Sequence, residues 1–458
     1  MEKKDVFPVV RTLDRQGWLL AQTSTALLDL QEITSVSLAA SSLYVTFLSF
    51  GFVVGSFTYG VACSHVNKFL IQFIALVLAS ISMATIPWCN IHAIMILVHA
   101  VAGFCNGILD AAVNAEMLAV WGNGGRRFMQ AMYFSDSLGG VISPLVTAPF
   151  LSNGPMTDQQ MLEDTEPGYE GRRFDTFVNS TDTHVNGSLS ISANITRTNL
   201  QIPAPFDITR TLSPAYAISS CIIMIVAIAY LFMFIMFKSD IYSERVSTEM
   251  TSARDFSKYR KLIILINMGL MTGLYIAIEE SFSGFLPTFC TKQLSWSKSN
   301  ASYALCVLYS CIGLGRFAAL FWVTYVNLKI ILGLFCFSIS IALGCVLLFS
   351  EHSMTICVWI SVAVTGFVFA IVLPTIFTWT EEDFFPVTGV ISSYFNIAAD
   401  CGATINPVII GTLMEHFSPM WFLYVLLAES ALLMMTYAVG VLLSRQQGTD
   451  ENKYQEME

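Results

Sequence analysis

The chain has 458 residues, of which 55% are hydrophobic and only 12% are charged. Because soluble domains carry roughly 25% charged residues, this composition excludes an ordinary soluble protein and predicts an all-α polytopic membrane protein. The net charge is −10, but the acidic residues fall mostly in the predicted loops and tail, so we interpret this charge as a contribution to solubility.

The first apolar stretch of the chain, residues 17–30, is too short to cross a membrane. Its sequence, GWLLAQTSTALLDL, would reach about 21 Å at 1.5 Å per residue, and Arg11, Asp14 and Arg15 directly precede it. We therefore predict a first helix that is short, re-entrant or missing.

The apolar segments that follow predict about eleven membrane-spanning helices. A bilayer core about 30 Å thick requires roughly 20 apolar residues in a helix, and open strands are excluded because lipid cannot pair their backbone groups. The predicted spans are 41–62, 69–88, 93–121, 128–151, 214–237, 262–287, 302–325, 328–349, 354–379, 387–413 and 419–443.

Residues 153–212 form a long polar loop that we expect to be extracellular and glycosylated. The loop contains three N-X-S/T sequons, which are acceptors for N-linked glycans, and a fourth sequon falls in a short loop on the same side. Three sequons within one loop are not expected by chance. The four sequon asparagines are Asn179, Asn186, Asn194 and Asn300.

Basic residues gather in the short loops on the side opposite the sequons, for example Arg126, Arg127 and Lys329. The positive-inside rule places that side in the cytoplasm. We expect a plasma-membrane protein whose C-terminus is cytoplasmic. The predicted parts are an N-terminal helical bundle at 1–237, a cytoplasmic linker at 238–261, a C-terminal helical bundle at 262–443 and a cytoplasmic tail at 444–458.

The two halves of the chain repeat each other. The sequence VAGF at 101–104 is echoed by VTGF at 364–367. Two further echoes occur in the same order along the halves: Gly55, Val66 and Asn67 with Gly315, Val326 and Asn327, and Gly139 and Pro144 with Gly402 and Pro407. Repeated bundles with a site between them are typical of secondary transporters, which open that site alternately to each side. The sequence therefore predicts two pseudo-symmetric helical bundles and a transport function.

Two predicted spans of the N-terminal half carry polar and charged residues at bilayer depth. Asp110 and Asn114 lie four residues apart on one helix face, and Gln130, Tyr133 and Asp136 lie three residues apart on the next span. Charges at this depth are costly and usually face a protein interior or a water-filled cavity, so each one is a functional hypothesis.

The C-terminal half offers a similar set. Glu279 and Glu280 are adjacent in one predicted span, and Asn396 and Asp400 lie one helical turn apart in another. Amides, hydroxyls and carboxylates suit a cavity for a hydroxyl-rich ligand such as a sugar, because its hydroxyls must be hydrogen-bonded once dehydrated. Carboxylates could also bind sodium or a proton. The alternative is that these residues only bond helices together, at about 1 kcal/mol each.

From these two sets we predict residues that bind the substrate and residues that couple transport to an ion. The predicted substrate-binding residues are Asp110, Asn114, Gln130, Tyr133, Glu279, Asn396 and Asp400. The predicted ion-coupling residues are Asp110, Asp136, Glu279 and Glu280.

Four further residues inside the predicted spans are expected to be structural. Arg316 lies in a predicted span, and we expect it to form an ion pair that supports the gate; pairing with a substrate group is the alternative. Pro144, Pro374 and Pro407 remove backbone donors inside predicted spans and are expected to kink those helices.

Motifs of soluble enzymes are absent from the sequence. There is no Walker loop, no HExxH helix and no CxxC pair, and the glycines of WGNGGRR at 121–127 follow a membrane helix rather than a strand. We therefore expect no enzymatic activity, no metal site and no cofactor, with sodium or a proton as the coupling ion. The expected partners are a small sugar and the lipid bilayer; we expect a monomer that binds no nucleic acid.

The chain resembles the major facilitator superfamily and, within it, the domain-containing protein 4 group, which includes sodium-dependent glucose transporters and is similar to bacterial fucose permeases. The resemblance lies in GILDAAVNAEMLAVWG at 107–122, MQAMYFSDSLGGVISPLVTAPF at 129–150, YIAIEE at 275–280 and LPTIFTWTEEDF at 373–384. It implies the major facilitator fold, with twelve helices in two six-helix bundles. It also implies that Asp110, Asn114 and Gln130 match polar residues of the permeases' fourth and fifth helices, and that Glu279 matches the family's seventh-helix glutamate.

The sequence departs from the family pattern at three places. Residues 26–31, ALLDLQ, resemble the family's sequence just after its first helix, which implies that this helix is absent. Ser64 and His65 occupy the superfamily's charged loop motif, where an Asp and a basic residue are usual. Tyr133 and Asp136 stand where a histidine and an apolar residue are expected.

The sequence favours a transporter of a glucose-like monosaccharide that works by alternating access. A sodium gradient is the coupling that the resemblance implies, and facilitated diffusion is a second possibility. Two other hypotheses stay open. One is a membrane scaffold that does not transport because its first helix is lost, and the other is a transporter of another hydroxylated or lipid-like solute.

Overall fold

The computed structural model describes residues 16–62, 66–121, 125–152, 208–236, 258–322, 327–385 and 389–455. Contacts divide the chain into two units, and all the described residues belong to the one made of Met1–Ser152 and Ile208–Glu458. The other unit, Asn153–Asp207, lies outside the described residues. The predicted loop sequons at Asn179, Asn186 and Asn194 lie in that second unit.

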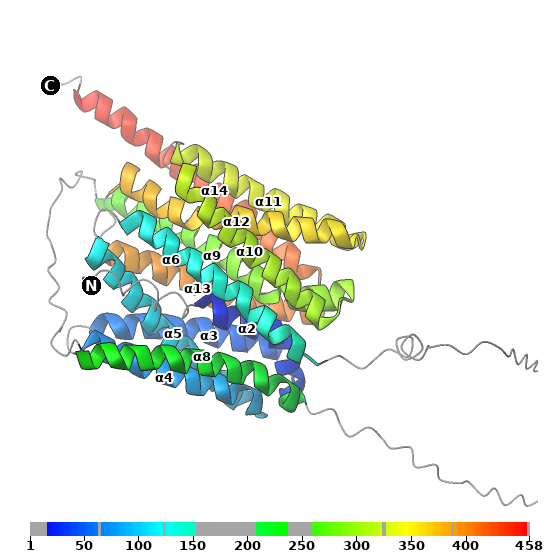
Figure 1. The fold of residues 1–458 in the computed structure, drawn as a ribbon. Coiled ribbons are helices and arrows are strands. Elements are labelled where there is room, and N and C mark those ends of the chain that lie inside the picture. Colours follow the sequence, from blue (N-terminus) through cyan, green and yellow to red (C-terminus); the bar gives the residue numbers. More distant parts are fainter. Residues whose placement is uncertain are drawn as a thin grey trace, which may run out of the picture. The chain divides into compact units, whose positions relative to one another are not determined.

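The described residues form twelve α-helices and two short 3₁₀ helices (Figure 1). Ten of the α-helices are long and apolar enough to cross a membrane, α2 and α6 being the exceptions. The α-helices are α2 (Gln16–Thr34), α3 (Leu38–Ala62), α4 (Lys68–Thr85), α5 (His92–Trp121), α6 (Gly125–Thr147), α8 (Ile208–Met236), α9 (Lys258–Leu294), α10 (Lys298–Trp322), α11 (Leu328–Glu351), α12 (Thr355–Asp383), α13 (Gly389–His416) and α14 (Trp421–Gln455). The 3₁₀ helices are η2 (Ile86–Trp88) and η4 (Ala148–Phe150).

The eleven predicted spans correspond to α3 to α14, but several helices run further than predicted. Helix α9 begins at Lys258, ahead of the predicted start at residue 262. Helix α14 continues through most of the predicted tail to Gln455, and Figure 1 shows its red end extending past the neighbouring helices. Hydropathy marks only the part of a helix that suits lipid, so it misses polar turns that continue the same helix.

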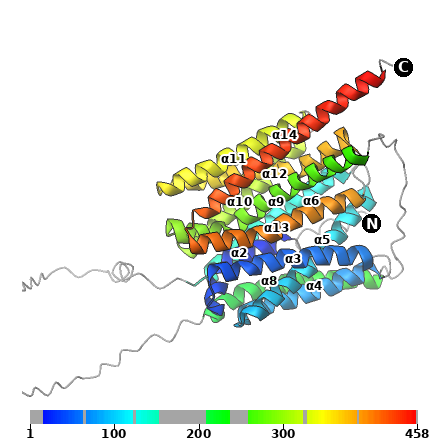
Figure 2. The ribbon, with the colours of Figure 1, turned by 180° about the vertical axis from the view of Figure 1, so that it is seen from behind.

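The first helix is present and short, which agrees with one of the predicted alternatives and shows that the alternative of a missing helix is wrong. Helix α2 has 19 residues, or about 28 Å at 1.5 Å per residue. The ALLDLQ segment lies inside this helix rather than after it. Figures 1 and 2 show α2 in dark blue, surrounded by helices of both halves.

Protein contacts explain why hydropathy undervalues α2. Its polar residues Gln22, Thr23 and Asp29 are all 0% exposed. The indole Nε1 of Trp18 donates to Ser219 Oγ of α8 at 3.0 Å, and Ser143 Oγ of α6 donates to the carbonyl of Trp18 at 2.9 Å. A helix enclosed by protein can carry polar residues that a lipid-facing helix cannot, because they do not face lipid and other parts of the chain can supply partners, as Ser152 and Lys298 do for Asp29.

The two halves each supply six of the described helices, α2 to α8 and α9 to α14; α2 and η4 both contact α10, and the main packing is along three pairs. Helix α3 packs against α13, α6 packs against α10, and α2 packs against α9. One hydrophobic cluster includes residues of both halves, among them Leu27, Tyr216 and Phe282. Isoleucine, leucine and phenylalanine side chains such as Ile225 and Phe321 are exposed on the helices, as a lipid-facing surface requires.

The sequence repeat has a structural counterpart in each half. Asn67 caps α4 by accepting from the backbone N of Phe69 at 2.9 Å, and Asn327 caps α11 by accepting from the backbone N of Lys329 at 3.1 Å. An added Cβ on Gly103 of α5 would lie 1.9 Å from the Leu48 carbonyl oxygen of α3. An added Cβ on Gly366 of α12 would lie 2.4 Å from the Leu308 carbonyl oxygen of α10. Equivalent helices therefore cross closely at equivalent glycines.

Gly103→Ala is expected to destabilise the protein strongly, because the new methyl group would press on rigid backbone of α3. Overpacking of this kind costs about 1–3 kcal/mol or more. Gly344→Ala is the matched control, since an added Cβ there meets nothing within 4 Å and alanine is favoured over glycine in a helix by about 1 kcal/mol. In detergent, Gly103→Ala should melt well below the parent and Gly344→Ala at or above it. Equal melting of the two variants would contradict the close crossing.

Candidate functional site

Arg316 of α10 joins the two halves in the interior. Its guanidinium pairs with Glu279 of α9, Nη2 to Oε1 at 3.3 Å, and with Asp136 of α6, Nη1 to Oδ2 at 3.8 Å. Nη1 also donates to the Tyr133 carbonyl at 2.8 Å and to Ser137 Oγ at 2.9 Å. The Arg316 side chain is only 9% exposed. One residue of the C-terminal half is therefore bonded to three residues of α6 in the N-terminal half.

Asp136 has a second role besides its ion pair. Its Oδ1 accepts from the backbone N of Gly17 at 2.8 Å, in the first turn of α2. The first backbone N–H groups of a helix have no acceptor within the helix, and the carboxylate supplies one. Its negative charge also complements the positive end of the helix dipole. Asp136 thus ties the start of α2 to α6 while also facing Arg316.

A second group of carboxylates meets between the halves. Glu280 of α9 and Asp110 of α5 lie close enough to Asp400 of α13 for their charges to interact with it. Glu280 likewise interacts electrostatically with Glu279 and Asp136, so the two groups influence each other. We call Asp110, Asp136, Glu279, Glu280, Arg316 and Asp400 the central charged cluster.

Glu280 also lines a small cavity. Ser49 of α3 and Asn106 of α5 contribute polar side chains to its wall, and Leu19, Leu20 and Phe52 contribute apolar ones. The cavity volume is about 10 Å³, which is room for about one water molecule. A sugar does not fit in this space, so a sugar site here requires the helices to move apart.

The chemistry of the central charged cluster favours cations. By definition it contains five carboxyl groups and one guanidinium, and four of the six residues belong to the C-terminal half. Like charges in a low-dielectric interior repel strongly, so binding of a proton or a sodium ion would relieve this excess. Carboxylates and a tyrosine ring are also common partners of sugar hydroxyls and sugar faces.

The structure brings several predicted site residues together. Tyr133 lies beside the cluster, with its ring centroid 5.4 Å from Cζ of Arg316. Asn396 is partly exposed on α13, one turn before Asp400. The side chains of Asn114 and Gln130 lie outside the described residues, although their backbones belong to α5 and α6.

The predicted structural and glycosylation residues have clear positions. Pro144, Pro374 and Pro407 each lie inside a helix that continues through the proline. Asn300 is exposed in the first turn of α10. The predicted kinks and the glycan stay predictions.

Sequence reasoning missed several residues of this region. Ser137 bonds Arg316, and Asn106 lines the small cavity four residues before Asp110. Their proximity in sequence to predicted residues was the available signal. Glu429 of α14 was also missed; it accepts from Asn406 Nδ2 at 3.0 Å, which also donates to Ser281 Oγ of α9 at 2.9 Å. These bonds of Asn406 hold helices of the C-terminal half together.

Solved structures of transporters align with nearly the whole chain. The E. coli fucose:proton symporter FucP is 12% identical and covers 96% of this chain and 97% of its own, with a TM-score of 0.53. The proton:xylose symporter XylE, bound to 6-bromo-6-deoxy-D-glucose, is 11% identical and covers 93% of this chain and 94% of its own, with a TM-score of 0.61. The chain has the major facilitator fold. The sequence prediction of this fold is confirmed.

Curated relatives match over most of the chain as well. Sodium-dependent glucose transporter 1A of Mus musculus is 25% identical over 85% of this chain and 84% of its own length. Sodium-dependent glucose transporter 1 of Homo sapiens is 24% identical over 84% of this chain and 69% of its own length. Major facilitator superfamily domain-containing protein 4A of Xenopus tropicalis is 22% identical over 92% of this chain and 88% of its own length. No family model matches the chain.

These relatives confirm the resemblance to the domain-containing protein 4 group. The chain is thus homologous to proteins named as transporters, and it is a membrane protein with many spans. The relatives from Mus musculus and Homo sapiens are named for transport rather than for an enzymatic reaction.

Proposed function

We propose that this chain carries a glucose-like monosaccharide across the plasma membrane by alternating access, coupled to sodium. The observation that carries the proposal is the central charged cluster, to which both halves contribute carboxylates around Arg316. Relatives named sodium-dependent glucose transporter support glucose as the solute and sodium as the coupling ion. The C-terminus is proposed to be cytoplasmic.

In this proposal the two halves rock against each other around the cluster. The small cavity beside Glu280 has the volume of about one water, so the sugar enters when α3 and α13, or α6 and α10, move apart. Asp110, Glu279 and Asp400 accept hydrogen bonds from sugar hydroxyls, and Tyr133 packs on the sugar ring. Sodium binds the acidic side of the cluster and lowers the repulsion among its carboxylates.

The proposal predicts saturable uptake of labelled glucose in cells that express the chain, and a loss of that uptake when external sodium is replaced by choline. Uptake is normalised to surface protein and compared with cells that carry the empty vector. Competition with unlabelled sugars, nucleosides and lipid-like solutes identifies the preferred class. Uptake that does not depend on sodium would contradict coupling to sodium. Uptake that increases on acidification would favour a proton as the coupling ion. No uptake of any solute by protein at the surface would favour the scaffold.

A further inference from the structure

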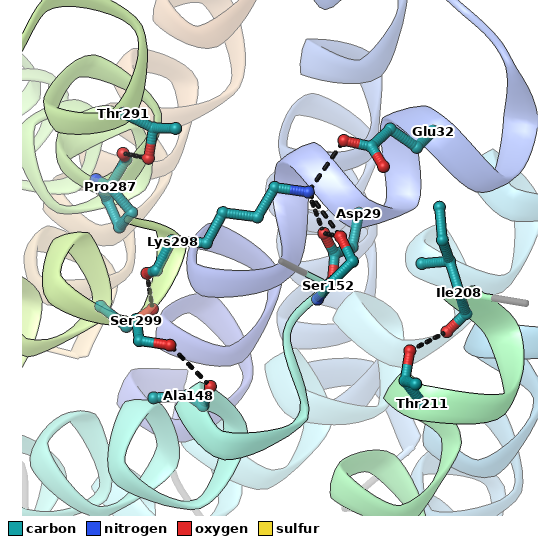
Figure 3. Close-up of polar contacts among 11 residues, drawn as sticks. Asp29, Glu32, Ala148, Ser152, Ile208, Thr211, Pro287, Thr291, Lys298 and Ser299 are labelled. Atoms are coloured by element: carbon teal, nitrogen blue, oxygen red, sulfur yellow. Dashed lines mark hydrogen bonds and ion pairs between the residues drawn. The ribbon is translucent and has the colours of Figure 1, made fainter. Parts of the chain in front are cut away.

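Lys298 joins the two halves at one end of the bundles, which we call the sequon end because Asn300 lies there and the residues 153–207 connect to it at Ser152 and Ile208. Its ammonium Nζ bonds Asp29 Oδ1 and, at 2.8 Å, Glu32 Oε1, both on α2. It also donates to Ser152 Oγ at 2.6 Å. Figure 3 shows the lysine reaching from the start of α10 to these three acceptors.

Asp29 is held in place independently of Lys298. Its carboxylate accepts from the backbone N of Ser152 at 2.9 Å and from Ser152 Oγ at 2.6 Å. Asp29 and Ser152 both belong to the N-terminal half, so these two bonds persist when the halves separate. The Asp29 side chain is 0% exposed, whereas that of Lys298 is 12% exposed. The pair therefore consists of a fixed acceptor and a lysine that can withdraw.

Other contacts close the same end. Glu415 Oε2 of α13 accepts from the backbone N of Leu38 at 2.9 Å, at the start of α3. Ser299 Oγ donates to the Ala148 carbonyl of η4 at 3.2 Å (Figure 3). An added Cβ on Gly411 of α13 would lie 2.5 Å from Ser42 Cβ of α3. The sequon end is thus shut along α3–α13 and along the start of α10.

We propose that Lys298 is a detachable latch: it holds the halves together while the sequon end is closed, and it leaves Asp29 and Glu32 when that end opens. This inference rests on the proposed alternating access. Lys298 bonds two carboxylates, those of Asp29 and Glu32, and the hydroxyl of Ser152. Removing the charge of the lysine should therefore favour opening of the sequon end. Asp29 stays bonded to Ser152 and receives the lysine again on closing.

Cys306 reports the opening directly. It lies on α10 eight residues after Lys298, about 12 Å further along the helix, and its Sγ is 3.6 Å from the Val141 carbonyl of α6 in the other half. The cysteine is only 8% exposed. A membrane-impermeant maleimide added to intact cells should reach it only when the sequon end opens.

The experiment compares Lys298→Gln with Lys292→Gln, a matched control that removes an exposed lysine from the last turn of α9. Because the chain has 11 cysteines, each variant is also made with Cys306→Ser, and the difference in labelling gives the rate at Cys306. We expect Lys298→Gln to label about fivefold faster than the parent, which corresponds to about 1 kcal/mol. Lys292→Gln should label like the parent. Equal rates in the two variants, or no labelling of Cys306 in either, would overturn the latch.

A second pair of variants separates a latch from general loosening. Asp29→Asn should also speed labelling, because it removes the other charge of the same pair while its amide oxygen keeps one of the two bonds from Ser152. The double variant Asp29→Asn with Lys298→Gln should label no faster than Lys298→Gln alone, because Asp29 then has no lysine left to hold. Additive rates would overturn the latch. Labelling of Cys306 needs no substrate. Fast labelling of Lys298→Gln without sugar uptake by the parent would therefore contradict the proposed sugar transport but not the latch.

Discussion

Arg316→Gln is expected to abolish sugar uptake and to lower the stability of the protein. The change leaves Asp136 and Glu279 in the interior without the guanidinium that both face. Removing one partner of a buried ion pair costs about 3–5 kcal/mol, because the remaining charge is uncompensated. We expect uptake per surface molecule to fall at least about tenfold, the effect of about 1.4 kcal/mol on a rate or affinity. The melting temperature in detergent should fall as well.

Two further variants test the reason for that loss. Arg316→Gln combined with Glu279→Gln should recover stability relative to Arg316→Gln, because one of the two uncompensated carboxylates is then neutral. It should not recover uptake, since Glu279 is a proposed sugar acceptor. Arg316→Lys keeps the charge but cannot bond Tyr133, Ser137 and Glu279 at once, so intermediate stability is expected. Normal uptake by Arg316→Gln would remove the cluster from the mechanism.

Asp136→Ala is expected to have the second largest effect. It deletes the acceptor for the backbone N of Gly17 and one ionic partner of Arg316. A buried donor left without an acceptor costs about 1–3 kcal/mol. The start of α2 should therefore loosen, so that both melting temperature and uptake fall.

Asp136→Asn separates the two roles of this residue. The amide oxygen still accepts from Gly17 and Arg316 keeps Glu279 as its ionic partner, so the melting temperature should stay close to that of the parent. The charge facing Arg316 is lost, so sodium dependence and uptake should change while surface expression is kept. If Asp136→Ala and Asp136→Asn lower the melting temperature equally, the contact with Gly17 does not anchor α2.

Hydrophobic pattern was enough to predict the helices α3 to α14, because lipid-facing residues such as Ile225 must be apolar over the full width of the bilayer. It failed for α2, whose polar residues are enclosed by protein. Gln22, Thr23 and Asp29 lower the hydropathy of that segment, yet none of them meets lipid. A rule that assumes a lipid environment cannot recognise such a helix.

The candidate site could be predicted in part. Charge at bilayer depth is rare, so Asp110, Glu279 and Asp400 stood out in the sequence. Periodicity assigns a residue to a helix face but does not say which helix it meets, so the bond between Asp136 and Gly17 could not be foreseen. Lys298 lies between the predicted spans 262–287 and 302–325, and the sequence does not indicate its role because its partner Asp29 lies on a helix that was not predicted in full.

The most direct measurement of the central claim is counterflow with purified protein in proteoliposomes. Vesicles loaded with unlabelled glucose are diluted into labelled glucose, with sodium on both sides, and Arg316→Gln vesicles serve as the matched control. The account predicts transient accumulation of label in the parent vesicles, none in the Arg316→Gln vesicles and none when choline replaces sodium. Equal entry of label into parent, variant and empty vesicles would contradict the proposal that this chain carries the sugar.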